Sequence, residues 1–195
     1  MKVWREDEFA ERYINRIFIV ICEGKAYKLT SNDGFHTNVF EIKCLESNIE
    51  ETDSRIILYC LFSSKEGYNS IKICSPDSDI FFIILTHIKC IESKVFFETG
   101  TGNNKKLINM TELASDFTSD YCMALTSLHA FTHCDTTSAF RGIGKIKPLK
   151  ILQKNPKYQN LLSRLGEDWS VPGGLSNNQV KFVCDIYKKP RFINI

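Results

Sequence analysis

Residues 69–90 read NSIKICSPDSDIFFIILTHIKC, and this stretch decides the fold class. Residues 69–74 predict a short strand. The almost unbroken apolar run that begins at Ile80 predicts a buried helix. Because the strand leads directly through SPDSD into the helix, the pattern is typical of a chain that alternates between strands and helices. The rest of the sequence must show how far this alternation extends.

The alternation extends on both sides of this stretch, and then gives way to helices alone. Further strands are expected at 17–30, as a hairpin turning at Glu23-Gly24, at 36–44, and as a second hairpin formed by KVFFETG (94–100) and KKLINM (105–110). Helices are expected at 5–15, 50–62, 119–131, 145–153, 156–166 and 176–188. This order predicts an α/β sheet domain with a helical C-terminal part.

Composition limits the possible classes of protein. The 195 residues suit one domain, with a sheet-containing core over 17–118 and a helical part over 119–195. A net charge of +2 means that any basic site must be local. The start of the chain is polar and the apolar runs are too short to span a bilayer, so we expect neither a signal peptide nor a membrane segment. The eight cysteines are scattered without a C-x-x-C pair, which favours reduced thiols in an intracellular protein. Within the cell, we expect a nuclear location.

Carboxylates gather in three places. Asp77 and Asp79 follow the predicted strand of residues 69–74, at the edge where open α/β sheets bind ligands. Glu51 and Asp53 lie in the first turn of the helix at 50–62, and Asp135 follows the helix at 119–131. Each has a purely structural alternative: a helix cap for Asp77 or Asp79, a favourable helix dipole for Glu51 and Asp53, and a turn for Asp135.

Taken together, the three places predict a metal site. Mg²⁺ prefers oxygen ligands and keeps several waters. Two such ions about 3.5–4 Å apart can stabilise both the attacking and the leaving oxygen of a phosphodiester. A site of this kind needs carboxylates from separate segments and no cysteine.

A glycine-lysine turn lies close to Asp135. Gly142-Ile143-Gly144-Lys145 precedes a predicted helix, with Lys147 two residues further on. Glycines let backbone N–H groups approach a phosphate, and lysines at a helix start are better suited to an anion than to the helix dipole. The alternative is an ordinary corner between two helices, because G-x-G by itself is a weak signal.

Three motifs in this order resemble a known family. SPDSDIFFIIL, HCDTTSAFRGIGKIKPLKIL and the upstream EETDSR are similar to the flap endonuclease (XPG-type 5′ nuclease) branch of the PIN-like superfamily. They are closest to transposon-associated members whose stretches read EEADTR, SPDTDV and LHAFTGCDTTSAF. The resemblance runs from about Ile17 to Tyr187, and residues 1–16 match poorly.

The resemblance implies a PIN-like, Rossmann-like central sheet flanked by helices and a metal-dependent nuclease, and it favours DNA over RNA as the substrate. It implies that two Mg²⁺ or Mn²⁺ ions are held by the family's acids, here Glu51, Asp53, Asp77, Asp79 and Asp135. It also implies a helix–turn–helix that grips the DNA backbone, which assigns nucleic-acid binding to Gly142, Ile143, Gly144, Lys145 and Lys147.

Two departures from the family pattern leave alternatives open. The family's first strand, with its early aspartate, has no match in residues 1–16, so the chain resembles an N-terminally truncated member. His133 stands where the similar stretches have glycine. A relative that binds nucleic acid without cutting it is therefore one alternative, and an interaction module is another. A third is a zinc site at His129, His133 and Cys134, since two histidines four residues apart on a helix can share a metal.

Overall fold

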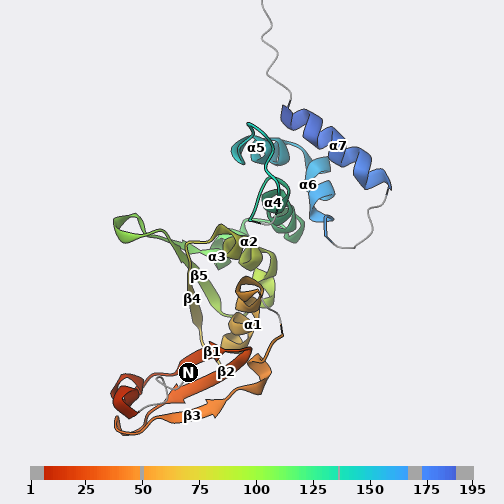
Figure 1. Cartoon of the computed structure of the whole chain (residues 1–195). Coiled ribbons are helices and arrows are strands. Elements are labelled where there is room, and N and C mark those ends of the chain that lie inside the picture. Colours follow the sequence, from red (N-terminus) through yellow and green to blue (C-terminus); the bar gives the residue numbers. More distant parts are fainter. Residues whose placement is uncertain (1–6, 49–50, 136, 167–172, 188–195) are drawn as a thin grey trace, which may run out of the picture. The chain divides into compact units, whose positions relative to one another are not determined.

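The computed structural model describes residues 7–48, 51–135, 137–166 and 173–187 (Figure 1). The contacts divide the chain into two compact units, Met1–Glu66 and Gly67–Ile195. The α/β class is confirmed, since both units combine strands and helices. The strands of the described residues form two three-stranded sheets, one in each unit. Among the described residues, no helix is long and apolar enough to cross a membrane.

The first unit contains an antiparallel meander. Strands β1 (Phe18–Cys22), β2 (Lys25–Thr30) and β3 (Asn38–Glu41) pair in chain order. The turn between β1 and β2 has Glu23 at φ 52° and Gly24 at φ 80°, as expected for a tight hairpin whose two central residues both need positive φ. The unit's helices are η2 (Asp7–Tyr13), η3 (Lys43–Leu45) and α1 (Thr52–Lys65), of which η2 and η3 are 3₁₀-helices. In this meander β2 is paired on both sides, and β1 and β3 are the edge strands.

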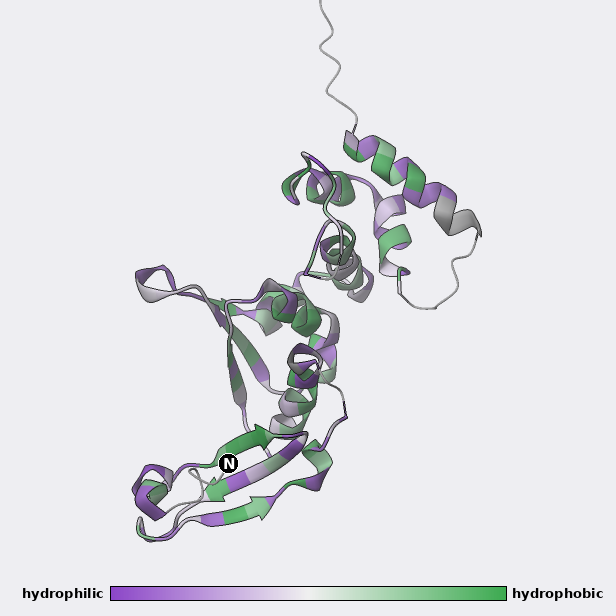
Figure 2. Ribbon diagram, in the orientation of Figure 1, coloured by the Kyte–Doolittle hydropathy of each residue, from purple (hydrophilic) through white to green (hydrophobic). Residues whose placement is uncertain are grey.

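The second unit begins with a βαβ arrangement. Strand β4 (Ser70–Cys74) and strand β5 (Lys94–Thr99) pair in parallel, joined by helix α2 (Ser78–His87) and the short η4 (Ile88–Cys90). Helix α2 is hydrophobic over most of its length (Figure 2). Its Ile84 and Leu85 are buried, and the ring of its Phe81 packs on the ring of Phe97 of β5 with centroids 5.7 Å apart. Burial of this apolar surface fixes α2 against the sheet.

The β5 strand also forms the second hairpin. Strand β6 (Lys106–Asn109) runs antiparallel to β5, and the connection between them includes the short η5 (Gly102–Asn104). The sequence predicted extended structure up to residue 110, but Met110 begins a helix, α3 (Met110–Ser115). The helix starts there because the Asn109 side chain caps it, accepting a hydrogen bond from the Glu112 backbone N–H at 3.2 Å.

Four helices complete the second unit: α4 (Ser119–Phe131), α5 (Ile146–Lys154), α6 (Pro156–Ser163) and α7 (Gly173–Tyr187). They share one hydrophobic core, formed by Ala124, Leu128, Leu152, Tyr158, Leu161, Leu162, Phe182 and Ile186. Helix α4 is also joined to α2, because the Thr126 hydroxyl hydrogen-bonds to the Thr86 hydroxyl at 2.7 Å and to the Phe82 carbonyl at 3.1 Å. All eight cysteines lie in the described residues and are free thiols.

Candidate functional site

The acidic loop Ser75–Asp79 lies at the carboxyl end of β4. The Ser75 backbone N–H donates to the Glu98 carbonyl of β5 at 3.0 Å, which fixes the loop to the end of the parallel pair. The Asp77 carboxylate caps α2, because its Oδ1 accepts the Asp79 backbone N–H at 2.8 Å. The capping alternative for Asp77 is therefore correct as a local contact. Asp77 and Asp79 are both partly exposed at the sheet edge where the sequence predicted a site.

Asp79 is joined to a buried histidine from a distant part of the chain. Its Oδ1 lies 2.7 Å from Nε2 of His129 on α4, and His129 is only 6% exposed. The imidazole stacks on the Phe82 ring of α2 with ring centroids 4.0 Å apart. The packing between α2 and α4 therefore carries a polar contact at its edge, which fixes the orientation of the Asp79 carboxylate.

The second nitrogen of His129 connects this pair to the glycine-lysine turn. Lys145 Nζ lies 2.7 Å from His129 Nδ1 and donates to the His133 carbonyl at 2.5 Å and to the His129 carbonyl at 3.4 Å. An ammonium group only donates, so Nδ1 accepts. With Nδ1 as the acceptor, the Nε2–H group of His129 is the donor to the Asp79 carboxylate.

The ammonium group of Lys145 is thus engaged by acceptors of the protein itself. Its three acceptors match the three N–H bonds of an ammonium group. Burial lowers the pKa of Lys145, and the negative charge of Asp79 acts in the opposite direction. The sequence predicted Lys145 as a ligand for nucleic-acid phosphate. In the structure its ammonium group instead holds the turn against the end of α4.

The two glycines of the turn differ in their backbone conformation. Gly142 has φ +73°, which favours glycine, whereas Gly144 has no such requirement. A side-chain carbon at either position would meet no protein atom within 4 Å, so both are open on the outside. Between them, Ile143 packs against the helical core. The predicted Lys147 lies in the first turn of α5 and is partly buried.

The remaining predicted acids come from other segments of the chain. Asp135 is exposed in the loop after α4. Glu51 and Asp53 belong to the first unit: Glu51 is the residue before α1 and its side chain makes no capping hydrogen bond, while Asp53 lies in the first helical turn. Among the described residues of the second unit, no three His, Cys, Asp or Glu side chains are grouped to hold a metal ion.

The zinc alternative is not supported by the geometry. Both ring nitrogens of His129 are engaged by Asp79 and Lys145. His133 lies beyond the end of α4, so the two histidines do not share a helical face. The His133 Nδ1 atom hydrogen-bonds with the Thr137 carbonyl at 2.9 Å.

Two features of the site were missed from the sequence. The contact between His129 and Asp79 joins residues 50 positions apart, and no local pattern signals such a pair. The second feature, a basic segment, could have been recognised in the sequence. Residues 141–164 contain seven basic residues and no acidic one, namely Arg141, Lys145, Lys147, Lys150, Lys154, Lys157 and Arg164. A local basic surface was therefore detectable despite the near-neutral chain.

Comparison of the chain with protein-family models, with characterised proteins and with solved structures found no match.

Proposed function

We propose that this chain is a PIN-like domain related to flap endonucleases, which binds DNA and hydrolyses its phosphodiester bonds with Mg²⁺ or Mn²⁺. The observation that carries the proposal is the hydrogen-bonded connection from Asp79 through His129 to Lys145. It joins the acidic loop at the end of β4 to the glycine turn before α5. A metal-binding edge and a phosphate-binding turn held together in this way suit a single substrate.

The acids suit a hard divalent ion. Asp77 and Asp79 offer carboxylate oxygens from one loop, and Mg²⁺ is commonly bound by one or two carboxylates together with substrate phosphates. Glu51, Asp53 and Asp135 are the further ligands that the family resemblance suggests. A bound ion would lower the pKa of the attacking water and stabilise the leaving oxygen. The protein itself would orient Asp79 through His129, which holds one carboxylate oxygen in place.

The glycine turn supports the DNA part of the proposal. The family resemblance implies a helix–turn–helix here, and helix α4, the glycine turn and helix α5 follow one another along the chain. The outer side of Gly142 and Gly144 is open, so a phosphate oxygen can approach the backbone N–H groups closely. Lys147 adds a positive charge next to the turn. A DNA substrate also favours a nuclear location.

A second candidate function is nucleic-acid binding without cleavage. It is favoured by one observation: the Oδ1 atoms of Asp77 and Asp79 already accept hydrogen bonds from the protein, from the Asp79 backbone N–H and from His129. Metal binding must then use the other carboxylate oxygens or displace these bonds. The two functions share a binding surface and differ in turnover.

Cleavage of a labelled 5′-flap DNA with added Mn²⁺ tests both candidates. The control is the double variant Asp77→Asn, Asp79→Asn. Asparagine caps a helix as well as aspartate and can still accept from His129, so this variant removes charge and keeps the fold. Cleavage lost in the double variant supports the nuclease. Binding without cleavage supports the second candidate, and a chain that neither binds nor cuts DNA or RNA refutes both.

A further inference from the structure

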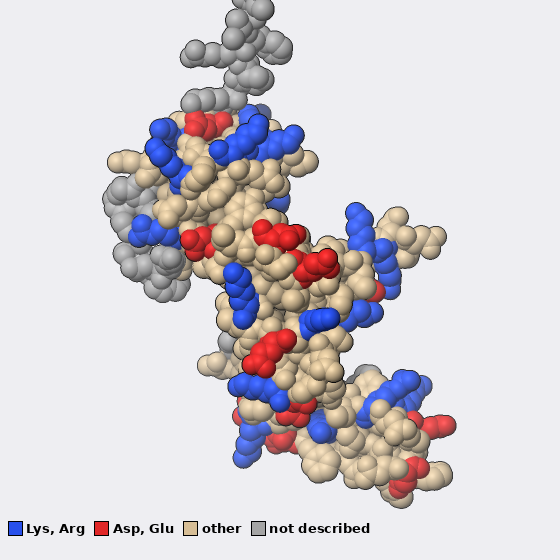
Figure 3. All heavy atoms as spheres, turned by 180° about the vertical axis from the view of Figure 1, so that it is seen from behind, with Lys and Arg blue, Asp and Glu red and all other residues tan. Residues whose placement is uncertain are grey.

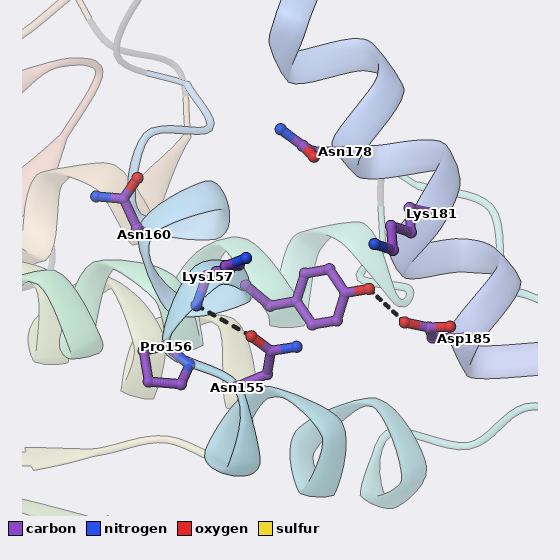
Figure 4. Close-up of a pocket in the computed structure, with 8 residues that line it drawn as sticks. Asn155, Pro156, Lys157, Asn160, Asn178, Lys181 and Asp185 are labelled. Carbon is purple, nitrogen blue, oxygen red and sulfur yellow. Dashed lines mark hydrogen bonds between the residues drawn. The ribbon is translucent and has the colours of Figure 1, made fainter.

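A groove lined by lysines lies between α5, α6 and α7, on the second unit. Two adjoining pockets of about 780 and 500 Å³ form it, and they share Asn155, Tyr158 and Asp185. Figure 4 shows the residues that line the larger pocket. We call this the basic groove because of the lysines that line it: Lys147, Lys150 and Lys154 of α5, Lys157 of α6 and Lys181 of α7. Several Lys and Arg side chains are visible over this helical part of the unit (Figure 3).

The charge of the basic groove is strongly one-sided. Among the described residues that line it, five lysines face one acid, Asp185, whose carboxylate accepts a hydrogen bond from the Tyr158 hydroxyl. On α5, Lys147, Lys150 and Lys154 are spaced so that they share one face of the helix. Neighbouring like charges repel one another, so an anion bound in the groove would relieve a cost that the free protein carries.

The base of the groove is held in place. The Asn155 side chain caps α6 by accepting the Lys157 backbone N–H at 3.1 Å. Tyr158 is 5% exposed, and its ring packs on Phe182 of α7 with centroids 4.9 Å apart. Because the lysines project from helices that share this core, an anion meets a largely preformed surface.

The chemistry of the lining favours phosphates over bases. The polar walls carry Asn160 and Asn178. The aromatic ring of the lining, Tyr158, is buried and cannot stack on a base. Lysine contacts the phosphate as a point charge and carries no sequence information. The groove therefore suits a ligand recognised through its backbone.

We infer that the basic groove binds the phosphodiester backbone of a nucleic acid without regard to sequence, at a distance along the chain from the acidic loop. The inference rests on the proposed function, since it extends the path of the same substrate. Lys147 and Lys154 lie seven residues apart, which is about 10 Å of helix. This length covers about three phosphates at about 3.4 Å of duplex axis per strand. An extended chain of phosphates fits such a row better than a single small anion.

The test measures binding of a labelled duplex and a labelled 5′-flap to the full chain, by fluorescence anisotropy over a series of salt concentrations. The groove variant is Lys150→Gln, Lys154→Gln, Lys181→Gln, which changes three exposed side chains. The matched control is Lys65→Gln, Lys94→Gln, Lys106→Gln, which removes the same charge from exposed sites outside the groove. Circular dichroism establishes that both variants remain folded.

We expect the groove variant to bind about tenfold or more weakly, and its log–log salt slope to fall by about 2–3, because each lost phosphate contact contributes about 0.9 to the slope. The control should bind like the unmodified chain. Equal affinities for all three proteins, or equal losses in the two variants, would overturn the inference. The inference would also be overturned if binding of a phosphopeptide depended on these lysines and binding of DNA did not.

Failure of the groove proposal and failure of the proposed function give different results. If the unmodified chain binds and cuts DNA but the groove variant binds equally well, the groove is not a DNA site and the nuclease proposal stands. If the unmodified chain binds no nucleic acid at any salt concentration, the proposed function is refuted, and the groove inference, which rests on it, is refuted with it. Cleavage that depends on Asp77 and Asp79 is measured on the same preparations.

Discussion

The backbone at His133 gives a sharp prediction, because this residue has φ +119°. Residues other than glycine rarely adopt such a backbone conformation, because their Cβ atom crowds the neighbouring carbonyl. Two contacts hold it there: the His133 carbonyl accepts the Lys145 ammonium at 2.5 Å, and its ring nitrogen bonds to the Thr137 carbonyl at 2.9 Å. The similar family stretches have glycine at this position, which the same physics explains.

The magnitude follows from a comparison of His133→Gly with His133→Ala. At an ordinary position alanine is more stabilising than glycine by about 0.4–1 kcal/mol, because it restricts the unfolded chain. A non-glycine residue in a sparsely populated backbone region costs about 1–3 kcal/mol. Both variants lose the same imidazole contact, so that loss cancels. The glycine variant should therefore be more stable than the alanine variant by about 1 kcal/mol.

The assay is urea-induced unfolding of both variants, followed by circular dichroism of the helices, with thermal unfolding as a second measure. A difference of about 1 kcal/mol corresponds to about 2–4 °C in Tm for a chain of this size. An alanine variant as stable as the glycine variant, or more stable, would show that residue 133 does not hold the positive φ in solution. Positive φ would then not explain the glycine that the similar family stretches have at this position.

Three further predictions concern the network and the core. Asp77→Ala should lower the free energy of unfolding by about 1 kcal/mol because α2 loses its cap, whereas Asp77→Asn should leave it nearly unchanged; equal losses in thermal melts would contradict the capping role. His129→Leu should cost about 2–3 kcal/mol in urea unfolding, because it removes the ring nitrogens that bond to the Asp79 carboxylate and to one N–H of Lys145; His129→Gln, which keeps a donor and an acceptor, should cost less. Burial, then the hydrogen bond to Asp185, raises the pKa of Tyr158 from 10.0 to about 12. The contribution of Tyr158 to stability should be present below pH 10 and lost between about pH 10 and 12. The difference in free energy of unfolding between the unmodified chain and Tyr158→Phe should therefore shrink over that range. A constant difference would refute the raised pKa.

Much of the local structure was predictable because its causes are local. The helix at 119–131 was predicted with the bounds that α4 has, since Thr118 caps its start and apolar residues recur at helical spacing. The turn at Glu23-Gly24 was predicted from the same kind of local signal and is confirmed. Asp77 was correctly recognised as a possible cap of the helix that follows it.

The rest depended on pairing between distant segments. Periodicity shows which residues form strands but not which strands pair, so the sequence did not reveal that β1–β3 and β4–β6 form separate sheets. Helix α3 was missed because its six residues are too few to show a period. The role of His129 was missed because its two partners, Asp79 and Lys145, come from segments on either side of α4.

Lys145 differs from the lysines of the basic groove in its contacts, and the sequence alone does not show this difference. Lys145 holds the glycine turn and, through His129, the Asp79 carboxylate, so a substitution there alters the acidic loop and the turn together. Weaker DNA binding by Lys145→Ala would therefore not identify a phosphate contact. Lys150, Lys154 and Lys181 are exposed and lie outside the Asp79–His129–Lys145 network, so their substitution reports on charge. If the proposed substrate path is right, loss of the groove lysines weakens binding while Asp77 and Asp79 still support cleavage at saturating DNA, whereas loss of Lys145 lowers both.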